Sequence, residues 1–318
     1  MTIKDIEMDI IRDWTDAYTE KFQKEIFSFK HNISKTGLFT DEALIELLGK
    51  HPAHLLDVCS MGDDTHPDYP NRFRTGDFRD SSAETLLAAA KAGRIWINVR
   101  QGMNVHPEYK AVLDKMYGSL SRKVGQKITD PRGGILISSP ISQTPYHFDK
   151  TETILWHVRG AKRIYIYPQT EEFISDKNYE EIVLNIMDDD LPYNESFDKH
   201  AKVFDLDEDE AILWPLNSPH RVDNSAFCVS VTTEYGTWAS KLKNSGMLAN
   251  ATLRKKWGIQ TSWRNEHTLS RYLKFVFGQA IKTTGLASKP EEADIVSFKL
   301  DPNVPNFIVD TPPYERNF

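Results

Sequence analysis

The chain has 318 residues, of which 40% are hydrophobic and 11% aromatic. This length and composition suit one large globular domain and exclude an intrinsically disordered chain. The formal net charge of −7 gives no general attraction to nucleic acid or anionic lipid, so we expect no direct nucleic acid binding. Two cysteines, Cys59 and Cys228, are too few for a disulfide framework and are typical of a reducing cytoplasm. No apolar run reaches the roughly 18 residues that a membrane helix needs, so we predict a cytoplasmic protein without a membrane partner.

The N-terminal part, residues 1–93, is predicted to be helical. Apolar side chains recur there at the spacing of an amphipathic helix, or follow a residue suited to a helix N-cap. The predicted helices cover residues 5–27, 41–49 and 82–93. Between them, residues 53–59 have the composition of a strand, and residues 61–80 are dense in Asp, Pro, Asn and Gly, which predicts a loop.

Residues 94–240 have a different character, with short segments rich in β-branched and aromatic residues. Gly, Pro or Asn bound several of these segments, as expected for strands joined by tight turns. The segments lie at residues 94–99, 134–138, 153–158, 163–167, 210–214 and 227–233. Many short antiparallel strands predict a jelly-roll core, so we expect a mainly β fold with flanking helices.

Residues 241–318 return to helical spacing over 242–257 and 268–281, and end in a Pro-rich tail. No internal repeat and no clear linker divides the chain. We therefore predict a single domain over residues 1–318, with helical additions at both ends of the jelly roll.

The most informative segment of the chain holds a histidine and an aspartate two positions apart. On an extended strand, residues i and i+2 project from the same face, so His147 and Asp149 can bind one metal ion together. His220 follows a later strand and is the candidate third ligand. Two histidines and one carboxylate leave coordination positions open, which suits iron(II) that must bind an oxidising co-substrate and O₂. Zinc fits less well, because no cysteine accompanies the set.

The His-x-Asp tripeptide is a weak signal when it is taken alone. The chain holds a second copy, His66-Pro67-Asp68, in the predicted loop, where the proline breaks strand pairing. In isolation, a structural role for His147 and Asp149 is at least as good an interpretation as metal binding.

Two polar residues near the predicted ligands point to an anionic co-substrate. Lys162 begins a strand, and a lysine inside a barrel is costly unless an anion pairs with it. A dicarboxylate such as 2-oxoglutarate would bind the metal through its keto-acid end and present its far carboxylate to Lys162. The hydroxyl of Thr144 could donate a hydrogen bond to the same carboxylate. From spacing alone, a solvated Lys162 beside the turn is an equally good interpretation.

The combined pattern resembles the JmjC and cupin-like Fe(II)- and 2-oxoglutarate-dependent oxygenases. Locally it is most similar to the asparaginyl hydroxylase that inhibits hypoxia-inducible factor, which has the same Thr-Pro-x-His-x-Asp order. The likeness covers residues 140–235 and implies a double-stranded β-helix, a form of jelly roll, with flanking helices. It rests on Thr144-Pro-Tyr-His147-Phe-Asp149, Gly160-Ala-Lys162-Arg163, Tyr167-Pro168, Trp214-Pro215 and Pro219-His220-Arg-Val222-Asp-Asn224.

By position, the resemblance implies that His147, Asp149 and His220 hold iron(II). It also implies that Thr144 and Lys162 hold the distal carboxylate of 2-oxoglutarate as co-substrate. No catalytic residue beyond the metal ligands is implied.

Two further residues match residues of the co-substrate pocket in position but not in type. Thr153 and Thr232 each fall where the asparaginyl hydroxylase has an asparagine. In relatives, C-terminal helices commonly mediate dimerisation, which predicts a homodimer through residues 242–281. Packing of these helices on their own barrel is the alternative interpretation.

The implied function is that of a 2-oxoglutarate-dependent dioxygenase, which hydroxylates a protein side chain or a small molecule, or removes an N-methyl group. One alternative is a metal-binding cupin that is not an oxygenase. Another is a JmjC-like regulatory or binding protein without catalysis. The sequence does not identify the substrate.

Overall fold

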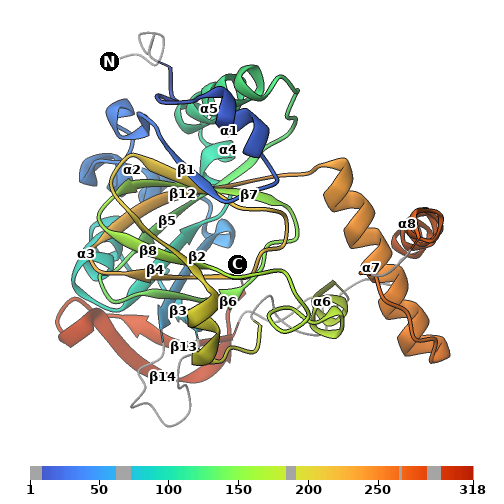
Figure 1. Cartoon of the computed structure of the whole chain (residues 1–318). Helices are drawn as coiled ribbons and strands as arrows, with labels where there is room; N and C mark the ends of the chain where they lie inside the picture. The colour runs from blue at the N-terminus through green and yellow to red at the C-terminus, as the bar shows by residue number, and fades with distance from the viewer. Residues whose placement is uncertain (1–8, 62–72, 184–190, 265–266, 285–294, 318) are drawn as a thin grey trace.

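The computed structural model describes residues 9–61, 73–183, 191–264, 267–284 and 295–317, and it is built around two β-sheets (Figure 1). The strands are β1 (Phe27–Lys30), β2 (Leu56–Met61), β3 (Phe73–Asp77), β4 (Ile95–Val99), β5 (Arg132–Ser138), β6 (Gln143–His147), β7 (Glu152–Arg159), β8 (Lys162–Ile166), β9 (Lys202–Leu206), β10 (Glu210–Leu213), β11 (His220–Asn224), β12 (Cys228–Tyr235), β13 (Ile295–Leu300) and β14 (Ile308–Glu315).

The helices lie mainly before and after the strands that form the core. The α-helices are α1 (Asp16–Lys21), α2 (Asp41–Lys50), α3 (Ala83–Ala92), α4 (Gly102–Val105), α5 (Pro107–Val124), α6 (Asp176–Val183), α7 (Trp238–Trp257) and α8 (Thr268–Thr283). The 3₁₀ turns are η2 (Ile33–Thr36), η3 (Ala53–Leu55), η4 (Glu195–His200) and η5 (Pro305–Phe307). Within the described residues, every helix is too short or too polar to span a bilayer.

Eight consecutive strands, β5 to β12, form a double-stranded β-helix. The larger sheet has the order β1-β10-β7-β12-β5-β4-β2-β3-β13-β14, and the smaller sheet has the order β6-β11-β8-β9. The chain thus passes repeatedly between the two sheets, and neighbouring strands of the eight pair antiparallel. This alternation is a jelly roll. The predicted mainly β fold with flanking helices is confirmed.

Two apolar layers hold the sheets in place. Helices α2, α3 and α5 pack on the outer face of the larger sheet, where they bury residues such as Leu44, Leu87 and Val112 against the strands. A smaller cluster fills the space between the two sheets: Leu155, Ile164, Ile166, Leu206, Ile212, Trp214 and Val222. Alternate residues of each strand enter these two layers, as the period of two along a strand requires. The first layer joins the helices to the larger sheet. The second layer lies inside the barrel but does not fill one of its ends, where polar side chains lie.

Several predicted helices have the expected ends. Thr40 caps α2 by accepting a hydrogen bond from the backbone N–H of Ala43 at 3.3 Å, and Ser82 caps α3 in the same way. The helices predicted over 242–257 and 268–281 correspond to α7 and α8. In Figure 1, α7 extends away from the barrel, and α8 lies against α7.

The prediction of a helix over residues 5–27 is wrong for most of its described part. Only α1 is helical there, while Ile11 forms an isolated bridge with His31 and β1 begins at Phe27. Trp14 packs edge-on against Phe27 and Phe29, with ring centroids 5.8 and 5.3 Å away. This tertiary packing outweighs the helical spacing of the apolar residues.

Both ends of the chain provide strands that the sequence did not predict. The segment at 53–59 begins with a 3₁₀ turn, and β2 starts only at Leu56. β3 lies within the predicted loop over 61–80, and β13 and β14 lie within the predicted tail. β13 pairs in parallel with β3 and antiparallel with β14, so the N- and C-terminal parts extend one sheet. The helix α5 had no predicted counterpart.

Candidate metal centre

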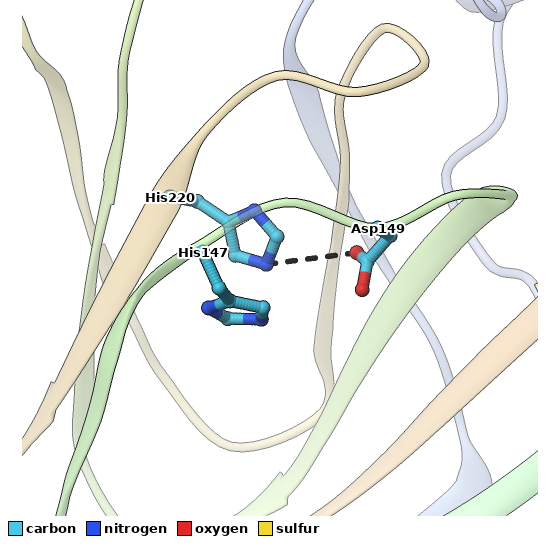
Figure 2. A group of neighbouring side chains, drawn as sticks. All are labelled: His147, Asp149 and His220. Atoms are coloured by element: carbon cyan, nitrogen blue, oxygen red, sulfur yellow. Dashed lines mark ion pairs between the residues drawn. The ribbon is translucent and has the colours of Figure 1, made fainter. Parts of the chain in front are cut away.

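The side chains of His147, Asp149 and His220 converge at one end of the jelly roll (Figure 2). Each offers a ligand atom, and the three atoms lie within 4.8 Å of one another. The Nε2 atom of His220 is 3.6 Å from Oδ2 of Asp149. Neighbouring ligand atoms around an ion bound at about 2.0–2.2 Å lie about 3 Å apart. The three side chains therefore need only small shifts to hold one metal ion.

A β-bulge brings the site together. β6 and β11 are neighbours in the smaller sheet, with His147 opposite His220 and Thr144 opposite Val222. Three steps along β6 thus match two steps along β11, so Thr144 and His147 face the same side although their positions differ by three, an odd number. Asp149 lies two residues beyond the end of β6. The prediction that His147 and Asp149 face the same way because both lie on one strand is therefore wrong in its reason, although the two side chains do meet.

Backbone carbonyls fix which nitrogen of each histidine can bind a metal. Nδ1 of His147 lies 2.7 Å from the carbonyl oxygen of Pro145, and Nδ1 of His220 lies 3.0 Å from that of Ser218. Because a carbonyl only accepts, each Nδ1 must carry the hydrogen. The lone pair of each neutral ring is then on Nε2, which is the arrangement seen in most metal-binding histidines.

The aspartate has a buried oxygen that the described protein does not satisfy. Oδ2 of Asp149 has no hydrogen-bond partner among the described residues. His220 is 4% exposed, and its burial lowers its pKa to about 4, with His147 adding to this effect and Asp149 opposing it. A neutral histidine pair beside an unpartnered carboxylate oxygen suits a divalent cation. The residues present therefore fit a metal ion.

Lys162 lies on the inner face of β8 and is 5% exposed. It stands opposite Asn224 of β11, on the same side as His220, which stands opposite Ile166 of β8. Among the described residues, no carboxylate lies within ion-pair distance of Lys162. Burial accordingly lowers the pKa of Lys162. A buried amine without a carboxylate partner fits an anionic ligand, and the solvated interpretation of Lys162 is wrong.

A chain of hydrogen bonds orients this lysine. Its Nζ donates to Oγ of Ser230 at 3.0 Å, and that hydroxyl lies 3.1 Å from Nδ1 of His157. Nε2 of His157 is 3.0 Å from the carbonyl oxygen of Gly160 and must carry the hydrogen, so Ser230 donates to Nδ1. Burial lowers the pKa of His157 to about 3, with Lys162 adding to the effect. Ser230 was not predicted to belong to the site, because a serine within a strand has no distinguishing spacing.

The other predicted pocket residues lie on strands of the larger sheet. Thr153 is buried on β7, and Thr232 is half-buried on β12, opposite Gly134 of β5 and Leu155 of β7. No hydrogen bond links either threonine to the three ligands in the described part of the chain. The second His-x-Asp tripeptide, His66-Pro67-Asp68, lies outside the described residues.

Comparisons with known proteins give structural neighbours but no sequence relatives. No protein-family model matches the chain, and no curated protein matches it. Among solved structures, the Escherichia coli ribosomal oxygenase YcfD in complex with cobalt and 2-oxoglutarate is 14% identical, with 89% of this chain and 73% of that chain covered and a TM-score of 0.48. The same enzyme with cobalt and succinic acid is 13% identical, with 89% and 73% covered and a TM-score of 0.45. At this level of similarity, neither structure assigns an activity to the present chain.

Proposed function

We propose that this protein is an Fe(II)- and 2-oxoglutarate-dependent oxygenase that hydroxylates a protein side chain or a small molecule. The observation that supports this most is the meeting of two histidines and one carboxylate beside a buried lysine. A structural His-Asp cluster would account for the three ligands alone. It would not account for Lys162, which is 5% exposed and has no carboxylate partner among the described residues.

The proposed roles follow from the position of each side chain. His147, Asp149 and His220 would hold the iron through two Nε2 atoms and a carboxylate oxygen, leaving other coordination positions open. Lys162 and Thr144 would bind the far carboxylate of 2-oxoglutarate, and Thr153 and Thr232 would line the same pocket. Iron(II), 2-oxoglutarate and O₂ together supply an oxidant able to break a C–H bond, with succinate and CO₂ as by-products. The apolar side chains between the sheets would exclude water from the inner end of the proposed pocket.

The decisive experiment compares wild type with the variants Lys162→Met and Arg163→Met under anaerobic conditions. Arg163 is the adjacent residue, but it is exposed and pairs with Asp205 at 2.6 Å. We expect Lys162→Met to weaken 2-oxoglutarate binding by roughly 10- to 100-fold with Fe(II) affinity retained, because a charge-assisted hydrogen bond contributes about 1.5–3 kcal/mol. Arg163→Met should leave both affinities unchanged.

Each rival function predicts a different result from these proteins. A metal-binding cupin of another class would bind Fe(II) but not 2-oxoglutarate. A regulatory protein without catalysis would form no succinate from 2-oxoglutarate in air even with Fe(II) present. If wild type binds no 2-oxoglutarate and His147→Ala binds metal as wild type does, the proposal is wrong.

We further propose that the protein forms a homodimer through α8. Three apolar residues of α8 follow helical spacing and are strongly exposed: Leu269 at 71%, Leu273 at 64% and Val276 at 64%. The other side of α8 packs so closely on α7 that a Cβ atom added at Gly278 would lie 2.0 Å from the carbonyl oxygen of Ser245. The apolar face is therefore left over after the helix has packed within its own chain. Such a face is typical of a contact with a second copy.

Three further proposals concern the location of the protein, its domain organisation and its local likeness to a known enzyme. A reducing cytoplasm is supported by the low number of cysteines, Cys59 and Cys228, which are both buried. A single domain over residues 1–318 is supported by the pairing of β13 with β3, which joins the two ends of the chain in one sheet. The likeness to the asparaginyl hydroxylase rests on the local order of residues from Thr144 to Asp149.

A further inference from the structure

We propose that Asn217, Tyr179 and Asn244 form a polar clamp that positions the metal ligand Asp149. This inference rests on the proposed metal site, and it assigns a role to three residues that are not themselves ligands. The three come from different elements. Asn217 lies between β10 and β11, Tyr179 lies on α6 and Asn244 lies on α7.

Asp149 needs such a clamp because its backbone is outside the sheet. β6 ends at His147 and β7 begins at Glu152, so residues 148–151 form no strand ladder. The backbone N–H and C=O groups of this segment must therefore find hydrogen-bond partners outside the sheet. The carboxylate of Asp149 can be held in one position only if the main chain that carries it is held as well.

Two side-chain amides satisfy two successive carbonyls of this segment. Nδ2 of Asn217 donates to the carbonyl oxygen of Asp149 at 2.7 Å. Nδ2 of Asn244 donates to the carbonyl oxygen of Lys150, also at 2.7 Å. The peptide units that follow the ligand are thus held from two directions.

Tyr179 joins the two amides. Its hydroxyl donates to Oδ1 of Asn244 at 2.6 Å and reaches Oδ1 of Asn217 at 3.2 Å. The ring of Tyr179 also packs against Phe148, with centroids 4.6 Å apart, so it contacts the residue before the ligand. Because both Tyr179 and Asn217 are buried, this network is shielded from water and strongly directional.

The clamp also connects the two ligand-bearing segments. Asn217 precedes the ligand His220 by three residues, and it adopts a left-handed backbone conformation with φ of 64°. Asparagine tolerates this conformation better than most residues do. One side chain therefore ties the loop leading to His220 to the carbonyl of Asp149. Groups of this kind around a metal ligand commonly change metal affinity 10- to 100-fold when they are removed.

The test compares clamp variants with matched variants elsewhere in the chain. Asn104 is the control for Asn244, since its amide also holds backbone groups, donating to Pro131 at 3.0 Å and accepting from Gly133 at 2.8 Å. Tyr109 is the control for Tyr179, since it is buried and its hydroxyl donates to the carbonyl of Leu38 at 2.7 Å. The proteins are wild type, Asn244→Ala, Asn104→Ala, Tyr179→Phe and Tyr109→Phe.

Two quantities are measured for each protein: the Kd for Co(II), by visible absorption, and the stability to urea in EDTA. We expect both members of each pair to lose stability, but only Asn244→Ala and Tyr179→Phe to lose Co(II) affinity, by about tenfold. The proposal is overturned if the clamp variants bind Co(II) within twofold of wild type, or if the controls lose as much affinity.

Hydrogen–deuterium exchange of the metal-free proteins separates this inference from the proposed function. Exchange in the peptide that spans residues 148–152 should rise in Asn244→Ala and stay at the wild-type level in Asn104→Ala. Unchanged exchange in Asn244→Ala would refute the clamp whatever the metal does. Failure of wild type to bind Co(II) would instead refute the metal site, with the exchange result still deciding whether the segment is clamped.

Discussion

Lys162 and Ser230 meet across the interior of the jelly roll, with Nζ of the lysine 3.0 Å from the serine hydroxyl. The two residues come from opposite sheets, since Lys162 lies on β8 and Ser230 on β12. The same hydroxyl contacts His157 at 3.1 Å, so one small side chain serves two buried nitrogen-containing groups. Its removal would leave the amine of Lys162 and Nδ1 of His157 buried without this hydrogen-bond partner, while Nε2 of His157 would keep its contact with Gly160.

Ser230→Ala is therefore expected to lower the free energy of unfolding by about 2 kcal/mol, because each buried polar group left unsatisfied costs about 1–3 kcal/mol. Urea denaturation of the metal-free protein measures this loss. Ser225→Ala is the control, since Ser225 is exposed and its hydroxyl makes only a 3.4 Å contact with the carbonyl of Ala161. A loss in Ser230→Ala no larger than in the control would contradict the network.

Asp149→Asn should separate metal binding from stability. In EDTA, we expect the variant to be at least as stable as wild type, because Oδ2 of Asp149 is buried without a hydrogen-bond partner in the described protein. With Co(II) at 100 times its Kd, wild type should gain about 2.7 kcal/mol in the free energy of unfolding, and the variant should gain much less. Asp205→Asn, at an exposed ion pair with Arg163, should keep the full gain. Equal gains in all three proteins would exclude Asp149 as a ligand.

Glu152 makes the stability of the protein depend on pH. Burial raises the pKa of Glu152 to about 7, and the hydroxyl of Thr237, which donates to it at 3.2 Å, opposes the shift. The folded state thus binds this proton more tightly than the unfolded state does. Its contribution to stability is complete below about pH 4.5 and is lost as the pH rises through about 7.

Glu152→Gln should remove this dependence. At pH 8 the variant is expected to be more stable than wild type by up to about 3 kcal/mol, at 1.36 kcal/mol per unit of pKa difference. The difference should shrink toward zero near pH 4.5, and urea denaturation across this range measures it. A constant difference between the two proteins over the range would show that Glu152 does not titrate with a raised pKa.

Leu273→Glu should convert the proposed dimer to a monomer. The charge would fall in the middle of the exposed apolar face of α8, where a second copy would have to bury it. Sedimentation equilibrium measures the mass, and Ile295→Glu is the control because Ile295 is also half exposed, but on β13. If wild type is already monomeric at micromolar concentration, or if both variants stay dimeric, α8 is not the interface.

The jelly roll and the meeting of three metal-binding residue types could be predicted because their signals are local. Short β-branched runs identify strands such as β7 and β12, and the motif residues His147, Asp149 and His220 do come together. The alignment of Thr144 with His147 could not be predicted, since it depends on a bulge between β6 and β11. A bulge leaves no mark in the spacing of one strand.

The remaining misses arise from contacts between distant parts of the chain. β3 pairs with β2 and β13, although its sequence Phe-Arg-Thr-Gly-Asp has no strong strand pattern. β13 does have the composition of a strand, Ile-Val-Ser-Phe-Lys-Leu, but it lies in a tail that its prolines marked as irregular. In its described part, the helix predicted over 5–27 is reduced to α1 because Trp14 packs on β1. Asn217 was not singled out for the same reason, since its role depends on carbonyls that only the folded chain brings near.

β6 and β11 are neighbours in the smaller sheet, although they are far apart in the sequence. This arrangement determines when the smaller sheet can form during synthesis of the chain. The ribosome adds His147 at the end of β6, and then Asp149, well before it adds His220, so a growing chain lacks one of the three proposed ligands throughout that interval. β11 is also the strand that lies between β6 and β8. Its arrival therefore completes the smaller sheet and places His220 opposite His147 in one step, while β12, which is made later, still has to join β5 to β7 in the larger sheet. Loading of the proposed metal site would then follow synthesis of β11 instead of guiding the strands before it.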